Sequence, residues 1–126
     1  MVQTDVPQLS RECSGWREAL RSYRDEFNQM KNQLQQVAGN ALSKEHLTDL
    51  ERFQNQLHIQ LINIHDLKQS VKNHEKKVQF EVSAKSGQLS EDTYADHEHL
   101  YDEYQYLEHT LEDLRNGLNK YVSSLQ

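Results

Sequence analysis

Seven histidines are spread along the 126-residue chain, and histidine is the side chain that most often binds transition metals in proteins. Di-iron helical bundles use Glu-x-x-His sequences, whose two side chains share one helix face, and many zinc proteases use His-Glu-x-x-His. Neither pattern occurs in this chain. The spacing of the histidines therefore predicts neither of these metal centres.

His65 and His109 are the weak metal candidates that the sequence does offer. If the segments on either side of Ser86-Gly87 form antiparallel helices, residues equally far from that turn come together, and His65 then lies near His109. In the alternative interpretation the histidines are polar residues of a coiled coil, and His97 contacts a carboxylate. We favour the alternative and expect no cofactor.

Cys13 is the only cysteine, so no disulfide can form within the chain. It lies one helical turn before Trp16, where a buried thiol behaves as a small apolar side chain. A catalytic thiol needs a neighbouring histidine and a cleft, and nothing in the sequence indicates either. The chain also lacks a glycine-rich phosphate loop, a nucleophile elbow and a cysteine pair of the zinc-binding type. We expect no enzymatic activity.

The segment 94–113, YADHEHLYDEYQYLEHTLED, combines tyrosines with acids and contains no lysine or arginine. Such a helix can present a recognition surface to a basic partner, with tyrosines as anchors. The alternative is that its acids pair with lysines of the preceding helix. If the surface binds a partner, the expected contact residues are Tyr94, Asp96, His97, Tyr101, Asp102 and Glu103.

Three long helices are predicted to position these side chains, at about 7–38, 44–84 and 91–125. In the first and third segments, apolar residues recur with gaps that alternate between four and three, which is the heptad spacing of coiled coils. Ser43 and Ser90 are suitable N-caps, and Gly39 and Gly87 are suitable helix ends.

The second helix carries one unbroken apolar column, which contains Leu50, Leu57, Ile64, Val71 and Val78. We expect its companion column to be the one that turns polar toward the end of the helix: Leu47, Gln54, Leu61, Lys68, Glu75 and Val82. Phe53 and Leu67 widen the apolar stripe.

Short connections make neighbouring helices antiparallel, so the predicted fold is an all-α, up-down-up three-helix bundle with coiled-coil-like packing. Its layout, with Trp16 in the seam of the first helix, resembles a spectrin repeat; the likeness is architectural and implies no function. The second helix is longer than the first. We therefore expect residues 75–84 and 91–99 to project beyond helix 1.

The outer side of the second helix is unusually apolar in the stretch LHIQLINIHDLK, residues 57–68. With Leu57, Leu61 and Ile64 facing inward, Ile59 and Ile62 point outward at 100° per residue. A symmetric dimer would cover them, with His58 and His65 at the edge of the contact. The alternative is that the two isoleucines are simply exposed.

Bulk composition narrows the class of protein. The net charge of −6 disfavours a nucleic-acid binder, and the N-terminus lacks the basic and apolar regions of a signal peptide. No apolar run is long enough to span a membrane. We expect residues 1–126 to form one cytoplasmic domain. The favoured hypothesis is a non-enzymatic scaffold that self-associates as a homodimer through helix 2; the alternatives are an adaptor for a basic partner and a histidine-based metal-binding bundle.

Overall fold

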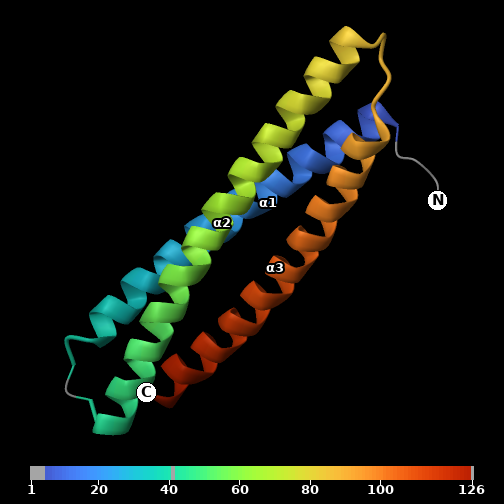
Figure 1. Ribbon diagram of the computed structural model, residues 1–126. Coiled ribbons are helices and arrows are strands. Elements are labelled where there is room, and N and C mark those ends of the chain that lie inside the picture. The colour runs from blue at the N-terminus through green and yellow to red at the C-terminus, as the bar shows by residue number, and fades with distance from the viewer. Residues whose placement is uncertain (1–4, 41, 126) are drawn as a thin grey trace.

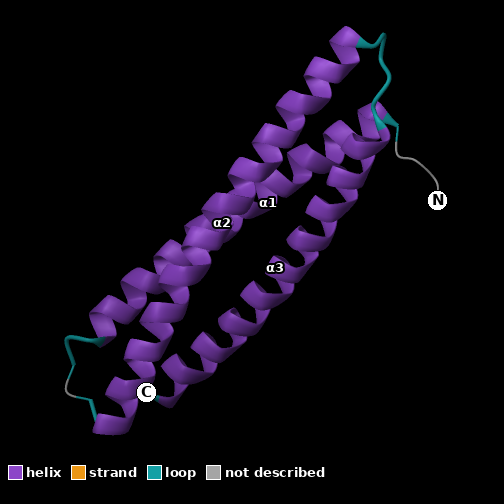
Figure 2. Ribbon diagram, in the orientation of Figure 1, coloured by secondary structure: helices purple, strands orange, loops and turns teal. Residues whose placement is uncertain are grey.

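The computed structural model describes residues 5–40 and 42–125 and contains three helices, α1 (Val6–Val37), α2 (Lys44–Ala84) and α3 (Glu91–Ser124). Figures 1 and 2 show an elongated bundle in which α2 runs antiparallel to both other helices. The predicted helices and the all-α three-helix fold are confirmed. Residues 1–4, 41 and 126 of the predicted domain lie outside the described residues. Within the described ranges, no helix is long and apolar enough to cross a membrane.

Each helix begins at a side-chain cap. Asp5 Oδ1 accepts a hydrogen bond from the amide of Gln8 at 2.8 Å, and Ser43 and Ser90 cap α2 and α3 in the same way. These caps satisfy amides that would otherwise have no partner in the first turn. α2 ends in a left-handed turn, with φ of 87° at Gly87, whose amide donates to the carbonyl of Val82. Glycine adopts this conformation without steric cost, so the turn and the antiparallel return of α3 follow from the sequence.

The core is a continuous seam along the bundle. It contains Leu9, Trp16, Leu20, Phe27 and Leu34 of α1, Leu50, Leu57, Ile64, Val71 and Val78 of α2, and Leu100, Leu107, Leu111, Leu114, Leu118 and Tyr121 of α3. The predicted unbroken column of α2 is therefore buried throughout.

The predicted companion column of α2 is wrong in part. Leu47 is exposed, and Glu75 instead forms an ion pair with Arg17 of α1 at 2.6 Å. The second buried column consists of Phe53, Leu67, His74 and Glu81, of which His74 and Glu81 contact α3. α2 packs against α1 on one flank and against α3 on the other. The predicted companion column, which is the more polar of the two, lies on the α1 flank.

The predicted projection beyond α1 is confirmed only for the end of α2 (Figure 1). Glu75, the first residue of the predicted projection, pairs with Arg17 of α1, and the start of α3 does not project. Glu12 and Cys13 of α1 both contact His97, so residues near the start of α3 lie beside α1. The prediction placed all the excess length of α2 at its C-terminal end. In fact α2 also begins below the end of α1 (Figure 1), and its extra length is divided between the two ends of the bundle.

Candidate functional site

The four residues of the predicted self-association surface all lie on the outside of α2. His58, Ile59, Ile62 and His65 are exposed. Ile59 and Ile62 retain 44% and 47% of their accessible surface. The structure therefore agrees with the inference that the three helices leave both isoleucines uncovered.

The predicted partner-binding residues of α3 divide into two groups. Asp96, Tyr101, Asp102 and Glu103 are exposed, and Asp96 forms an ion pair with Lys77 of α2 at 2.8 Å. Tyr94 is half-buried. His97 is only 5% exposed, so its assignment to a recognition surface is wrong. It occupies a seam position of α3 and faces the other two helices.

The weak metal candidates His65 and His109 are both exposed. His109 Nε2 lies 3.5 Å from Asp113 of its own helix. Neither histidine belongs to the group of three metal-ligating side chains that converges within the described part of the chain. Within the described residues, neither His65 nor His109 is therefore part of a three-ligand metal site.

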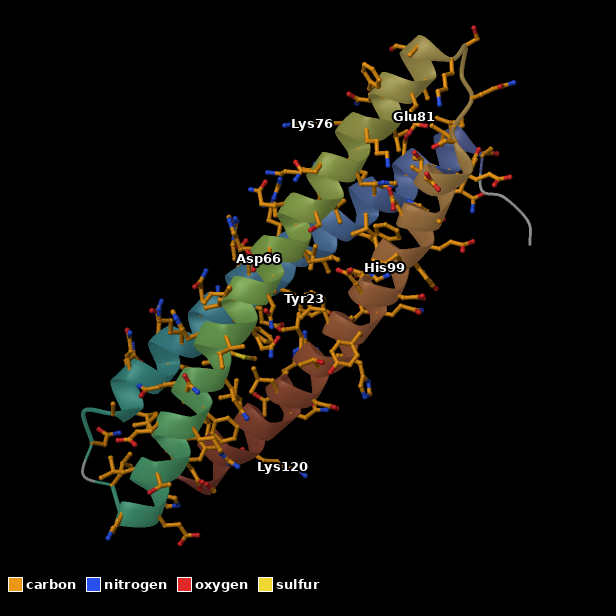
Figure 3. All side chains as sticks on the ribbon, in the orientation of Figure 1. Tyr23, Asp66, Lys76, Glu81, His99 and Lys120 are labelled. Atoms are coloured by element: carbon orange, nitrogen blue, oxygen red, sulfur yellow. The ribbon has the colours of Figure 1, made fainter. Side chains whose placement is uncertain are left out.

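A groove of about 620 Å³ runs between α2 and α3. Leu67 and Leu107, each more than nine-tenths buried, contribute its apolar part. Tyr106 also lines it and is 77% exposed. The remaining lining residues are polar or acidic: Gln60, Asn63, Asp66, Ser70, Asp102, Glu103 and Thr110. Figure 3 shows Asp66 along the middle of α2.

The acidic α2–α3 groove and the basic residues around Lys68 lie on different sides of α2. The residues that line the α2–α3 groove include three carboxylates and no lysine or arginine. On the α1–α2 side, Lys68 lies among like charges. Burial and the positive charges of Arg24, Lys72 and Arg21 lower its pKa. The predicted pairing of the α2 lysines with α3 therefore holds for Lys77 alone among the ion pairs of residues 5–40 and 42–125.

A buried polar cluster joins all three helices, with Cys13 from α1, His74 from α2 and His97 from α3. Their ligating atoms all lie within 4.8 Å of one another. His97 Nδ1 is 3.2 Å from His74 Nε2 and 3.9 Å from Cys13 Sγ. All three side chains are buried, so one thiol and two imidazoles face one another in a site that is largely shielded from solvent.

Two neighbours in α1 fix the orientation of the His97 ring. Glu12 Oε2 lies 3.4 Å from His97 Nε2, the nitrogen that faces away from the cluster. The ring of Trp16 stacks on the imidazole with a centroid distance of 4.8 Å. The sequence-based expectation that His97 contacts a carboxylate agrees with this geometry.

Burial controls the protonation of the cluster. It raises the pKa of the Cys13 thiol to about 12, and the negative charges of Glu75 and Glu12 add to the effect. Desolvation lowers the pKa of His74, and the adjacent His97 lowers it further. In the absence of a cation, Cys13 is a neutral thiol at neutral pH.

A second buried polar group closes the α2–α3 turn. Glu81 accepts hydrogen bonds from the Thr93 hydroxyl and, at 2.9 Å, from the Ser90 amide. These bonds lower the pKa of Glu81 to about 2. Figure 3 shows Glu81 on the side of α2 that faces α3. Glu81 is a polar residue at a buried position because it caps the start of α3, and both of its carboxylate oxygens have hydrogen-bond partners without a ligand.

Sequence reasoning missed His74 as a member of a site, although a signal was present. Phe53 and Leu67 lie fourteen residues apart on one side of the apolar stripe, and continuing by another heptad step from Leu67 reaches His74. The hairpin pairing that brought His65 near His109 also brings His74 near His97.

Comparison with known proteins finds no matching family model, no similar curated protein and no similar solved structure.

Proposed function

We propose that this protein is a non-enzymatic interaction module that binds a basic amphipathic helix of a partner protein in the α2–α3 groove. The observation that carries the proposal is the combination of an apolar strip with three carboxylates in one groove. The groove between two neighbouring helices can hold a third helix, and amphipathic helices are commonly bound in such grooves.

The chemistry of the groove selects the partner. Leu67 and Leu107 can contact the apolar face of an incoming helix, and Tyr106 supplies a large exposed side chain of the type that anchors interfaces. Asp66, Asp102 and Glu103 would then meet the edges of that helix, where lysine or arginine gives complementary charge. A second copy brought to this groove by a two-fold axis would place these carboxylates opposite one another, which disfavours a symmetric dimer here.

A synthetic amphipathic helix of leucine and lysine is a suitable probe, with a leucine–glutamate helix of the same pattern as its counterpart. We expect the lysine peptide alone to bind, with affinity that falls as salt rises, because exposed charges are screened. Fluorescence anisotropy of the labelled peptide measures both. Equal binding of the two peptides would contradict the proposal.

Charge reversal locates the site. Asp102→Lys with Glu103→Lys should abolish peptide binding. The matched control, Glu51→Lys with Glu98→Lys, changes the net charge equally at exposed positions outside the lining of the groove and should retain most of it. Equal loss in both double variants would show that overall charge, and not the groove, governs binding.

Self-association through the outer face of α2 is a second candidate, favoured by the exposure of Ile59 and Ile62. Full burial of an isoleucine contributes about 1.5–3 kcal/mol. Four side chains that are roughly half exposed would therefore contribute about 3–5 kcal/mol in a symmetric dimer, which the cost of association, roughly 4–15 kcal/mol, would offset. A tight dimer would need further contacts along α2.

Light scattering over a range of concentrations tests this second candidate. A mass near twice 14.9 kDa that returns to the monomer value in Ile59→Glu with Ile62→Glu would support it. A dimer that persists in this double variant would remove the two isoleucines from the interface.

A further inference from the structure

The buried cluster of Cys13, His74 and His97 has the composition of a transition-metal site. Thiolate sulfur and imidazole nitrogen are the donors that Zn²⁺ prefers, and zinc sites with three protein ligands complete their coordination with water. The three donors come from α1, α2 and α3, and all are buried. None belongs to the α2–α3 groove of the proposed function, so this inference stands independently of it.

The distances suit a single tetrahedral cation. With Zn–N near 2.1 Å and Zn–S near 2.3 Å, tetrahedral ligands lie about 3.4 Å apart for two nitrogens and about 3.6 Å apart for nitrogen and sulfur. The structure gives 3.2 Å between His97 Nδ1 and His74 Nε2, and 3.9 Å between His97 Nδ1 and Cys13 Sγ. The third pair, Cys13 Sγ and the ligating nitrogen of His74, lies within 4.8 Å, so these two side chains must move closer together for one cation to bond to all three atoms.

The surroundings of His97 match those of a metal ligand. Its Nδ1 faces both other donors, and its Nε2 faces Glu12. A ligating histidine commonly donates its second ring N–H to a carboxylate, which fixes the tautomer and the orientation of the ring. Trp16 covers one face of the imidazole. Glu12 and Glu75 place negative charge near Cys13, and the guanidinium of Arg17, which pairs with Glu75 at 2.6 Å, partly offsets it.

A cation can approach the cluster along the bundle surface. His74 lines a second groove of about 380 Å³ between α2 and α3, together with Asn73, Asp96 and Leu100. His74 itself is nearly closed off, with 5% of its surface exposed. The site therefore combines a route from solvent with a shielded interior, as metal sites in folded domains require.

We propose that Cys13 Sγ, His74 Nε2 and His97 Nδ1 bind one Zn²⁺ that staples the three helices together, with Glu12 as the positioning residue of His97 and water as the fourth ligand. Binding replaces the S–H bond of Cys13 by an S–Zn bond and releases its proton to solvent. Both imidazoles bind in their neutral form, and no oxidation or reduction takes place. Coordination would fix the relative positions of the three helices, because each ligand belongs to a different helix.

Titration of the metal-free 126-residue chain with Co²⁺ and Zn²⁺ tests the proposal. Co²⁺ bound to a thiolate gives a charge-transfer absorption in the near ultraviolet, so this band reports the Cys13 bond directly. We expect one Co²⁺ per chain with this band, displacement of Co²⁺ by Zn²⁺, and a higher Tm with Zn²⁺. Absence of the band in the folded wild-type protein overturns the proposal.

Variants assign the ligands. Cys13→Ser should abolish the band, and His74→Leu should weaken Zn²⁺ binding by more than the roughly 100-fold that loss of an outer partner produces. The matched control, His65→Ala with His109→Ala, removes two exposed histidines and should leave binding unchanged. Circular dichroism in chelator shows whether each variant folds; if Cys13→Ser does not, His74→Leu and His97→Leu provide the same comparison. Unchanged Zn²⁺ affinity in a folded ligand variant, or its loss in the control, would refute the assignment.

Discussion

Glu12 provides a selective test of the proposed zinc site, because it faces His97 without belonging to the ligand set. Its Oε2 lies 3.4 Å from His97 Nε2, and its side chain keeps 31% of its accessible surface. Replacement by alanine removes the acceptor from a position on α1 where alanine is a favourable helix residue. The three ligands and the buried seam remain in place, so the folded state should survive.

Loss of such an outer partner usually weakens metal affinity 10–100-fold, which equals about 1.4–2.7 kcal/mol. When zinc is well above its Kd, the stabilisation that it gives falls by the same amount. The entropy of unfolding is about 2.1 cal/mol/K per residue, or about 0.26 kcal/mol/K for 126 residues. Glu12→Ala should therefore lower the zinc-bound Tm by about 5–10 °C and leave the Tm in chelator nearly unchanged.

Competition with a chromophoric chelator gives the affinity, and calorimetry with and without zinc gives the two Tm values. Glu12→Gln should recover part of the loss, since its amide oxygen can still accept a hydrogen bond from His97. Glu18→Ala is the matched control, an exposed glutamate of the same helix. If Glu12→Ala lowered the Tm equally with and without zinc, its role would be structural and the assignment as a positioning residue would be refuted.

Three further substitutions have outcomes that are expected from the geometry. The pKa of Glu81 in the folded state is about 2, lowered by hydrogen bonds from Thr93 and the Ser90 amide. Its stabilising effect is therefore complete above the pKa of the unfolded state, near 4.5, and is lost as the pH falls toward 2. Chemical denaturation of Glu81→Gln should show a weaker pH dependence of stability in this window. Gly15→Ala should raise the free energy of unfolding by about 0.5–1 kcal/mol, because nothing lies within 4 Å of the new methyl group. Gly117→Ala should do the same, because its methyl group would lie at an ordinary contact distance from Phe53. A lower Tm for Gly117→Ala in thermal unfolding would contradict the packing described for that position.

The helices were predictable from the sequence because caps and heptad spacing are local signals. The side chains of Asp5, Ser43 and Ser90 cap the three helices by accepting hydrogen bonds from amides three residues later. The column from Leu50 to Val78 is buried along its length. These features depend on residues within one or two turns, so the chain specifies them without reference to its neighbours.

The site was less predictable because it depends on the axial offset between helices. The expected offset placed residues 91–99 beyond α1, which left Cys13 without a histidine. The connection between α1 and α2 moves the start of α2 past the end of α1 (Figure 1), and this shift brings Cys13 to the level of His97. An error of a few residues in offset is small for the fold but decides which side chains meet.

The position of the polar cluster suggests why a metal would be useful to this bundle. In a seam of leucines, a thiol and two imidazoles contribute less apolar burial than leucine at the same positions, and neutral polar groups in a core require partners. His74 and His97 have one short contact between them, and Cys13 has only a long one. A cation would satisfy all three donors at once and hold the N-terminal part of α1 against the α2–α3 hairpin. Zinc availability would then set how firmly α1 is docked against the α2–α3 hairpin.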